Sequence, residues 1–278
     1  HEVQKGVTPI NGVRNIIAIA SGKGGVGKST VAVNLALALS SEGATVGILD
    51  ADIYGPSQPR MLGVNQRPES VDGKTLEPLV SYQVQVMSIG FLIEEDSPMI
   101  WRGPMVTQAL EQLLNDTRWK DLDYLVVDLP PGTGDIQLTL AQKVPVSGAV
   151  IVTTPQNIAL LDARKGLKMF EKVEIPVLGI IENMSTHICS ECGHEEYIFG
   201  AGGGKRMADD YDVEDLGNIP LDLRIRADVD AGKPTVMADP DGAIADIYRR
   251  IARRVGGKLA VRKRNYSDVF PSIVIENN

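Results

Sequence analysis

Cysteines, aromatic residues and long apolar runs are scarce in this sequence. The chain of 278 residues contains two cysteines, too few for a disulfide framework, so we expect a cytoplasmic protein. No apolar run approaches the roughly 18 residues of a membrane-spanning helix, and no signal peptide opens the chain, so we expect no membrane partner. Aromatic residues make up 5% of the chain, which predicts a core of aliphatic side chains.

An excess of basic charge is also missing. The chain carries 28 Lys and Arg residues against 36 Asp and Glu residues, and this net charge of −8 argues against nucleic acid as a partner. The strongly basic stretch 249–264 overlaps an apolar stripe formed by Ile244, Ile247, Ile251 and Val255. Such a helix can bind a membrane or nucleic acid, but this stripe is narrow and lacks Phe and Trp. We therefore interpret the stretch as a packed helix whose basic face lies in solvent.

Short apolar runs alternate with helical patterns along most of the chain. The expected strands are residues 15–20, 45–49, 84–87, 124–127, 149–153, 176–181 and 216–219, and the expected helices are 31–39, 105–114, 158–170 and one that opens at Asp239 and Pro240. This alternation predicts an α/β fold, a mostly parallel sheet with helices on both faces. We expect a single domain over residues 13–264, an N-terminal linker or tail over 1–12, a C-terminal tail over 265–278, and a mobile loop over 55–74.

A phosphate-binding loop follows the first expected strand. Residues 22–29 read GKGGVGKS and match G-x-x-x-x-G-K-[ST] between a β-branched run and an Ala/Leu-rich helix. The glycines let backbone N–H groups point at phosphate oxygens, and the helix N-terminus adds a favourable dipole. Lys28 would neutralise the β- and γ-phosphates, and the Ser29 hydroxyl would ligate Mg²⁺. The residues expected to contact the nucleotide here are Gly22, Lys23, Gly24, Gly25, Val26, Gly27, Lys28, Ser29 and Thr30.

A second lysine, Lys23, directly follows the first glycine of the loop. The basic motif does not require it, so it is either a solvated loop charge or a functional cation. In the functional interpretation it would be supplied to the γ-phosphate of a neighbouring subunit, like an arginine finger.

Carboxylates follow two of the expected strands. Asp50 and Asp52 come after residues 45–49, and Asp128 comes after residues 124–127. Because the carboxyl ends of parallel strands share one edge of the sheet, we expect Asp52 and Asp128 to help bind Mg²⁺ beside the loop. The N–H of Gly132 would then reach the γ-phosphate. The alternative for each aspartate is a helix N-cap or turn residue, which is our interpretation of Asp135.

The two cysteines form a C-x-x-C pair, Cys189 and Cys192, in a polar loop. With His187 and His194 they resemble a zinc knuckle, which needs four ligands. An iron–sulfur cluster also needs four thiolates, which two chains would supply. A redox dithiol is disfavoured because such pairs sit at a helix N-terminus. The local sequence leaves zinc and iron–sulfur open, with zinc slightly favoured.

Several motifs together resemble a known family. Residues 21–30 are similar to the deviant Walker A motif of the MinD/ParA/nitrogenase-iron-protein class, with Lys23 as its signature lysine. The further motifs are LDADIYGPS at 49–57, WRGP at 101–104, DLPPGTGD at 128–135, and the cysteine pair followed by FGAGGG at 199–204. Over residues 11–260 the chain resembles the Mrp/ApbC family of ATP-binding iron–sulfur cluster carriers.

The resemblance implies an ATP- and Mg²⁺-dependent homodimer that hydrolyses ATP slowly and transfers a 4Fe–4S cluster, held by Cys189 and Cys192 of both chains, to apo iron–sulfur proteins. It implies catalytic roles for Lys23, Lys28 and Asp52, with Asp52 positioning the attacking water, and a second switch at residues 128–132. It also implies that Asn183, Pro220 and Asp222 contact the adenine. The alternatives are a MinD/ParA-like switch ATPase that positions cargo on a membrane or DNA, and a metal-binding scaffold with ATP as a structural ligand.

Overall fold

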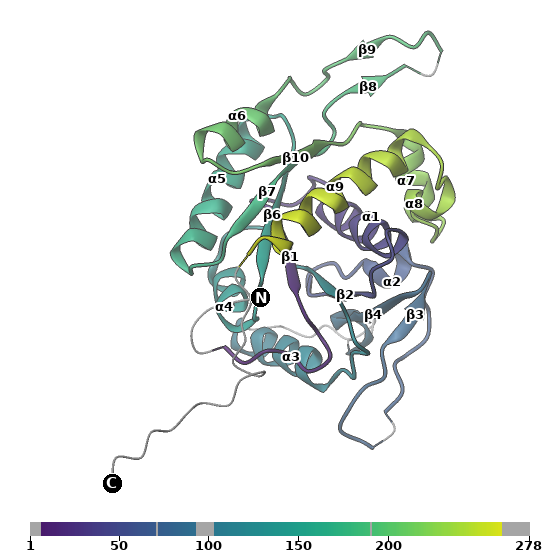
Figure 1. The fold of residues 1–278 in the computed structure, drawn as a ribbon, viewed down its shortest axis with the longest axis vertical. Helices are drawn as coiled ribbons and strands as arrows, with labels where there is room; N and C mark the ends of the chain where they lie inside the picture. Colours follow the sequence, from purple (N-terminus) through teal and green to yellow (C-terminus); the bar gives the residue numbers. More distant parts are fainter. Residues whose placement is uncertain (1–6, 71, 93–102, 190, 263–278) are drawn as a thin grey trace.

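The computed structural model describes residues 7–70, 72–92, 103–189 and 191–262, and its centre is a twisted sheet (Figure 1). In the described residues this sheet has eight strands in the order β10-β7-β6-β1-β5-β2-β4-β3. Adjacent strands of this sheet run parallel, except for the antiparallel pair β3–β4. The strands are β1 (Ile16–Ala20), β2 (Val46–Asp50), β3 (Leu79–Ser81), β4 (Val84–Ser88), β5 (Tyr124–Asp128), β6 (Gly148–Thr153), β7 (Val177–Glu182) and β10 (Asp215–Asn218). The predicted α/β fold is confirmed.

Two layers of helices cover the sheet because its central strands are apolar on both faces. Along β1, Ile17 and Ile19 face one core, while Ile16 and Ala18 face the other. The first core packs against α1 (Lys28–Ser41), α7 (Leu223–Asp230), α8 (Thr235–Ala238) and α9 (Ala243–Ala260). The second packs against α3 (Gly103–Asp116), α4 (Asp135–Lys143), α5 (Asn157–Lys172) and α6 (Gly203–Asp210). The core is aliphatic, as the composition predicts.

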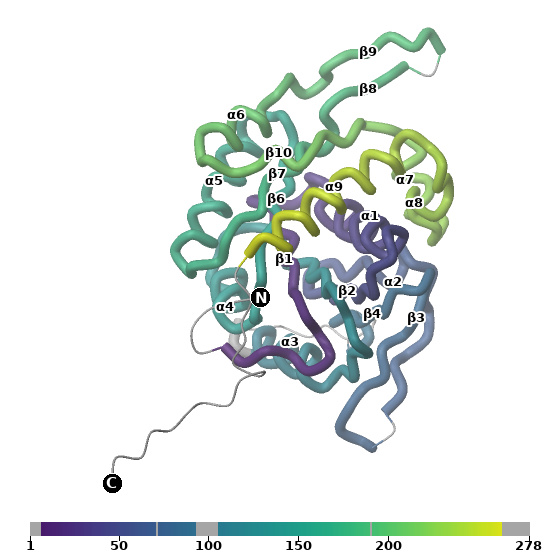
Figure 2. The backbone as a smooth tube through the Cα atoms, viewed as in Figure 1, coloured from purple at the N-terminus to yellow at the C-terminus, as the bar shows by residue number. Residues whose placement is uncertain are grey.

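A small hairpin projects from the body of the molecule. Its strands β8 (His187–Ile188) and β9 (Glu195–Glu196) pair antiparallel and form a separate two-stranded sheet. Figure 2 shows this hairpin at one end of the molecule, extending beyond α6 and β10. The two cysteines lie between its strands.

The region 55–74, expected to be a mobile loop, is not loop throughout. It contains the short helix α2 (Gln58–Met61), and Gln58 and Leu62 are both buried. The Ser57 and Gln58 N–H groups at the start of this helix donate to the Asp50 carboxylate, at 2.8 and 2.9 Å. A carboxylate therefore caps the N-terminus of α2 and holds its first turn.

Two helix starts also differ from the predictions. The last helix begins at Ala243, because α8 ends at Ala238 and a turn, with the Gly242 N–H donating to the Asp239 carbonyl, separates the two helices. The apolar stripe of this last helix faces the core as expected, with Ile244 and Ile251 buried. Asp135 is the first residue of α4, so Gly134 occupies the N-cap position, where no side-chain hydrogen bond caps the helix.

The packed domain extends beyond the expected boundary at residue 12. Ile10 is buried in the core, and the Gly12 carbonyl accepts a hydrogen bond of 2.7 Å from the Leu122 N–H. The predicted tail 265–278, as well as Trp101 and Arg102, lies outside the described residues. None of the helices described is long and apolar enough to cross a membrane.

Candidate functional site

The predicted juxtaposition of strand ends is the basis of the site. Strand β1 lies at the centre of the sheet between β5 and β6, where the strand order reverses, and the phosphate loop follows it. Asp50 and Asp128 end neighbouring strands at the same register. The Leu129 N–H donates to the Ile19 carbonyl at 3.1 Å, which brings the β5 turn beside the loop. Three distant parts of the sequence thus meet at one edge.

The phosphate loop needs its glycines for conformation and for close packing. Gly27 has a φ of 82° and caps α1 without a side-chain hydrogen bond, so the first N–H groups of α1 can bind an anion. A Cβ on Gly27 would lie 2.3 Å from the Asn183 amide nitrogen. A Cβ on Gly22 would lie 2.1 Å from the backbone of Asp162 in α5. The loop is therefore held between α5 and the residue that follows β7.

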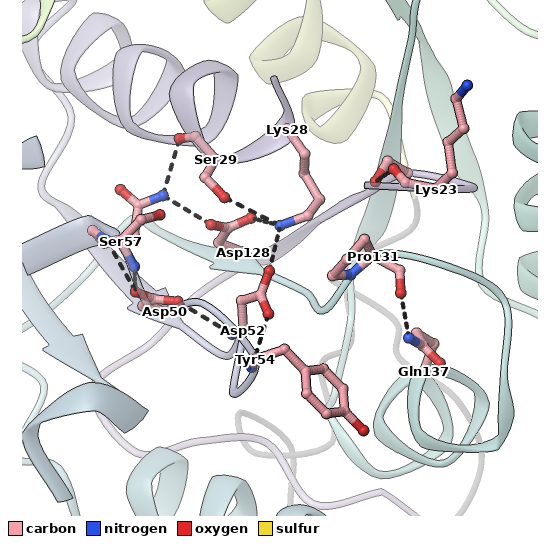
Figure 3. A network of polar contacts seen from close by, with 12 residues as sticks. Lys23, Lys28, Ser29, Asp50, Asp52, Tyr54, Ser57, Asp128, Pro131 and Gln137 are labelled. Atoms are coloured by element: carbon pink, nitrogen blue, oxygen red, sulfur yellow. Dashed lines mark hydrogen bonds and ion pairs between the residues drawn. The ribbon is translucent and has the colours of Figure 1, made fainter. Parts of the chain in front are cut away.

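Lys28 joins the loop to the carboxylates (Figure 3). Its side chain is buried, and its Nζ donates to Asp128 Oδ1 and to Ser29 Oγ, the latter at 3.3 Å. Its Nζ also lies 3.8 Å from Asp52 Oδ2. A buried ammonium group requires such carboxylate partners. The structure therefore brings together Lys28, Ser29, Asp52 and Asp128, as the strand-end argument predicts.

The carboxylates at this edge are in different environments. Burial, reinforced by the negative charge of Asp128, raises the pKa of Asp50 to about 7. Burial also raises the pKa of Asp52, although the nearby Lys28 ammonium opposes the shift. Asp50 accepts hydrogen bonds from the start of α2 and from the Ser88 hydroxyl. Asp50 is therefore a capping residue, the alternative given for it above.

Gln58 also belongs to the site, although no motif or spacing in the sequence points to it. Its side chain is fully buried, and its Nε2 donates to Asp128 Oδ2 at 2.9 Å and to the Ser29 carbonyl at 3.0 Å. It therefore connects α2 with the phosphate loop and the end of β5. A glutamine before a proline in a presumed loop carries no signal of this role.

An open cleft of about 260 Å³ lies over the phosphate loop. Among the residues that line it are Lys23, Lys28, Asp52 and Pro131. Figure 3 shows the Lys23 side chain directed away from Lys28 and the carboxylates.

The Gly132 N–H is not directed at this cleft. It donates to the Ser21 carbonyl at 2.9 Å, and the residue has a φ of 102°. The expected contact with a γ-phosphate would require this hydrogen bond to break. The neighbouring Pro131 carbonyl accepts a hydrogen bond of 2.5 Å from Gln137 Nε2.

Of the three residues expected at the adenine, Asn183 lies at the phosphate loop and donates from Nδ2 to the Val26 carbonyl at 2.9 Å. Pro220 precedes a segment beside the cysteine hairpin, where the Leu221 N–H donates to the Thr186 carbonyl at 2.7 Å. Asp222 caps α7 by accepting from the Arg224 N–H, and its hydrogen bonds with the Arg224 side chain lower its pKa.

The cysteine hairpin presents its thiols to solvent. Cys192 is exposed and Cys189 is partly exposed. Two backbone hydrogen bonds of 2.9 Å close this end of the hairpin: the Cys189 N–H donates to the His194 carbonyl, and the Gly193 N–H donates to the Cys189 carbonyl. Hydrogen bonds from the backbone N–H groups of Cys192 and Glu191 lower the pKa of the Cys189 thiol. The lowered pKa favours the thiolate form that binds metals.

The four local ligands of the zinc interpretation are not gathered into one site. The His187 Nδ1 lies 3.1 Å from the Leu221 carbonyl oxygen and is engaged there. In the part of the chain that the structure describes, no group of three or more His, Cys, Asp or Glu side chains is placed to hold a metal ion. Cys189 and Cys192 therefore form an incomplete ligand set within one chain.

The glycine-rich motif at 199–204 connects the hairpin to the body of the protein. The Gly204 N–H donates to the buried Glu182 carboxylate at 2.6 Å, and a Cβ on Gly204 would lie 2.9 Å from Glu182 Cβ. Burial raises the pKa of Glu182, and the hydrogen bonds from α6 oppose this shift. A Cβ on Gly203 would lie 2.5 Å from Leu160. The motif is thus explained by close packing of α6 on α5 and β7.

A parallel sheet with a phosphate loop after its central strand, and carboxylates at the neighbouring strand ends, defines a P-loop NTPase. The family comparison is more specific. The chain belongs to the ParA family of NUBPL iron-transfer P-loop NTPases, whose model matches residues 12–256. The resemblance stated from the motifs is confirmed.

Relatives of known name support this assignment. The chain is 62% identical over 251 residues to the iron-sulfur cluster carrier protein of Escherichia coli (strain K12), covering 90% of this chain and 68% of that protein. It is 61% identical over 261 residues to the iron-sulfur cluster carrier protein of Pseudomonas fragi, covering 93% and 91%. It is 52% identical over 253 residues to the mouse iron-sulfur cluster transfer protein NUBPL, covering 90% and 79%.

Solved structures give the same fold. A nucleotide-binding protein of Archaeoglobus fulgidus, in complex with ADP, is 39% identical with a TM-score of 0.71, and the match covers 80% of this chain and 88% of that one. The septum site-determining protein MinD of Pyrococcus horikoshii, complexed with Mg-ADP, is 25% identical with a TM-score of 0.65, covering 89% and 97%.

Proposed function

We propose that this chain is a cytoplasmic, ATP-binding iron–sulfur cluster carrier that hydrolyses ATP slowly as a homodimer and delivers a 4Fe–4S cluster to apo-proteins. The names of the relatives support an iron–sulfur cluster as the cargo, and the phosphate loop supports the binding of a nucleotide. The slow turnover, the cluster type and the dimer go beyond the relatives' names.

The observation that carries the proposal is the incomplete pair of cysteines at the end of the projecting hairpin. Cys189 and Cys192 are accessible, and the described part of the chain offers no further ligand beside them. An all-cysteine 4Fe–4S cluster takes four thiolates, so two hairpins must meet around it. The lowered pKa of Cys189 suits it to bind iron as the thiolate.

At the nucleotide site, Lys28 would leave the carboxylates to pair with the β- and γ-phosphates. The oxygen donors Ser29, Asp52 and Asp128 fit Mg²⁺, which prefers hard oxygen ligands and, when bound, would neutralise phosphate charge. Asp52 would also position the attacking water. The Lys23 side chain is directed away from the carboxylates of its own chain, and it would reach the γ-phosphate of a nucleotide held by the partner chain.

The rest of the nucleotide would lie along the loop. Backbone N–H groups from Gly24 to Thr30 would surround the phosphates, with Gly22 and Val26 shaping the loop and Gly132 approaching in the triphosphate state. Asn183, already bonded to the loop, and Pro220 and Asp222 would contact the adenine.

Anaerobic reconstitution with iron and sulfide tests the cargo. We expect a brown protein with about four irons and four sulfides per dimer. The Cys189→Ser and Cys192→Ser variants should not bind the cluster. Both variants should still bind ATP, because the phosphate loop and the hairpin are separate sites. A colourless protein with one zinc per chain, lost on changing His187, would contradict the proposal and favour a structural zinc loop.

A further inference from the structure

The peptide group between Pro131 and Gly132 is held at both of its ends. Its carbonyl accepts a hydrogen bond of 2.5 Å from Gln137 Nε2, and its N–H donates to the Ser21 carbonyl at 2.9 Å. A peptide unit is planar, so its C=O and N–H turn together as one rigid group. The Gly132 N–H therefore cannot turn toward the cleft without pulling the Pro131 carbonyl away from Gln137.

The side chain of Gln137 lies directly against this turn. It is buried, and it belongs to the first turn of α4, which follows the turn in the chain. A Cβ on Gly132 would lie 3.5 Å from Gln137 Nε2, and a Cβ on Gly134 would lie 3.2 Å from its Oε1. A backbone carbonyl can only accept a hydrogen bond, so the amide must present its Nε2 to Pro131. Figure 3 shows this contact, with Gln137 reaching Pro131 from α4.

The two residues on either side of the peptide allow it to rotate. Such a rotation changes ψ of Pro131 and φ of Gly132. The proline ring fixes only φ, and glycine adopts φ of either sign because it has no Cβ. Gly132 now has a φ of 102°. Pro-Gly fits the central positions of type I and type II turns, which differ in the orientation of this peptide, so the hydrogen bonds decide which orientation is stable.

The peptide is at the wall of the nucleotide cleft. Ser21 and Pro131 both line the cleft, together with Lys28 and Ser29 of the phosphate loop. In the proposed function the Gly132 N–H approaches a γ-phosphate, which a diphosphate lacks. A triphosphate would then have to break both hydrogen bonds of the peptide, whereas a diphosphate would leave them in place.

We propose that Gln137 is a positioning residue that sets the preference of the site between a nucleoside triphosphate and a diphosphate. By holding the Pro131 carbonyl, it stabilises the orientation in which the Gly132 N–H faces Ser21, and this orientation suits the diphosphate. The triphosphate binds with the peptide rotated, so its affinity is lowered by the free energy of the hydrogen bond that Gln137 loses. The inference rests on the nucleotide site proposed above.

The test compares two equilibrium affinities in each protein. Calorimetry gives the Kd for Mg-ADP and for a non-hydrolysable ATP analogue with Mg²⁺, in the wild type and in Gln137→Met, which keeps the length of the side chain without its donor. The ratio of the Kd for the analogue to the Kd for ADP should fall about threefold to tenfold in the variant, because one hydrogen bond no longer has to break. The Kd for ADP should change little. Gln137→Leu is the second variant if Gln137→Met does not fold.

Thr139→Val is the matched control on the same helix. The Thr139 hydroxyl donates to the Asp135 carbonyl at 2.7 Å, within α4. Its loss affects the helix without reaching the Pro131 carbonyl, so the ratio of the two Kd values should stay as in the wild type. If Gln137 only stabilised the start of α4, Gln137→Met would lower the thermal stability and leave this ratio unchanged.

The outcomes distinguish this inference from the proposed function. A wild type that binds neither nucleotide would overturn the nucleotide site itself. A wild type that binds both, with an unchanged or increased ratio in the Gln137 variant, would overturn only the role of Gln137. Crystal structures of the wild type provide a check without a variant: we expect the hydrogen bond from Gln137 to Pro131 with ADP and a rotated peptide with the analogue. The same peptide orientation in both would also overturn the inference.

Discussion

At the scale of single residues, the two lysines of the phosphate loop differ in their surroundings. The Lys28 ammonium is buried between Asp128 and Asp52, in the middle of the polar network of Figure 3. Lys23 is partly exposed, lines the cleft and is directed away from that network. In the proposed function, the first lysine would bind a phosphate of the nucleotide held by its own chain, and the second would act on the nucleotide held by the partner.

Substitution should separate the two roles. Lys28→Ala should weaken ATP binding about tenfold to 100-fold, because it removes a charge-assisted contact with the phosphates. Lys23→Ala should lower kcat about 100-fold and change the Kd for ATP little, because its contact forms only in the transition state. Equilibrium binding and single-turnover hydrolysis measure the two effects. Lys205→Ala, an exposed helix lysine, is the control, and an unchanged kcat in Lys23→Ala would leave Lys23 as a solvated charge.

Asp50 should make stability depend on pH. Burial first, and then the Asp128 charge, raise its pKa from 3.8 to about 7. Between these values the folded protein holds a proton that the unfolded chain has released, so the contribution of Asp50 to stability falls as pH rises from about 4 to 7 and is constant above. Asp50→Asn cannot titrate, so its free energy of unfolding should fall less over this range. Urea unfolding at several pH values measures this dependence, and Asp241→Asn, at an exposed position, is the control. If the free energy of unfolding changes with pH in the same way in the wild type and in Asp50→Asn, the prediction is wrong.

At the scale of elements, the sequence was most informative where structure is local. Strands such as β1 and the helix α1 follow from β-branched runs and an Ala/Leu-rich segment, and the phosphate loop follows from its motif. The short elements α2 and β3 and the hairpin pair were not predicted. They have two to four residues and are stabilised by distant partners, as when Gln58 contacts Asp128 seventy positions away.

The same limit applies to the site. Lys28, Asp52 and Asp128 could be placed together because parallel strands end at one edge of the sheet. The role of Asp50 as a cap and the hydrogen bond from Gly132 to Ser21 depend on side-chain and turn geometry that composition and spacing do not carry.

The N-terminus of α1 should tolerate no side chain at Gly27. Gly27 and Gly43 both have left-handed backbones, with φ of 82° and 95°, so alanine costs about 1–2 kcal/mol of strain at each. A Cβ on Gly27 would also meet the Asn183 amide, whereas a Cβ on Gly43 would meet nothing within 4 Å. Gly27→Ala should therefore be less stable than Gly43→Ala and bind ATP more weakly. Thermal unfolding and ATP titration compare them, and equal effects on binding would contradict the contact with Asn183.

At the scale of the whole molecule, the cysteine hairpin projects from the body of the protein and carries two accessible thiols, with no third metal ligand beside them among the described residues. If two chains share a cluster, the metal holds the interface together, so removing it should weaken the dimer. Sedimentation of the reconstituted protein should give a dimer, and chelation of the iron should shift it toward monomer. Cys192→Ser, measured in parallel, should not respond to iron. A cluster-bound monomer would contradict the shared site.

The ion pairs of Lys28 have a further consequence for ligand entry. Because the ammonium is already neutralised by Asp128 and Asp52, a phosphate can take it over only if those carboxylates receive another counter-ion. If Mg²⁺ is that counter-ion, as proposed, the site would work as an ion exchanger, in which an anion and a divalent cation enter together in place of one internal pair. By thermodynamic reciprocity, each would then strengthen the binding of the other by the same factor, and the concentration of free Mg²⁺ would set how much nucleotide the protein holds.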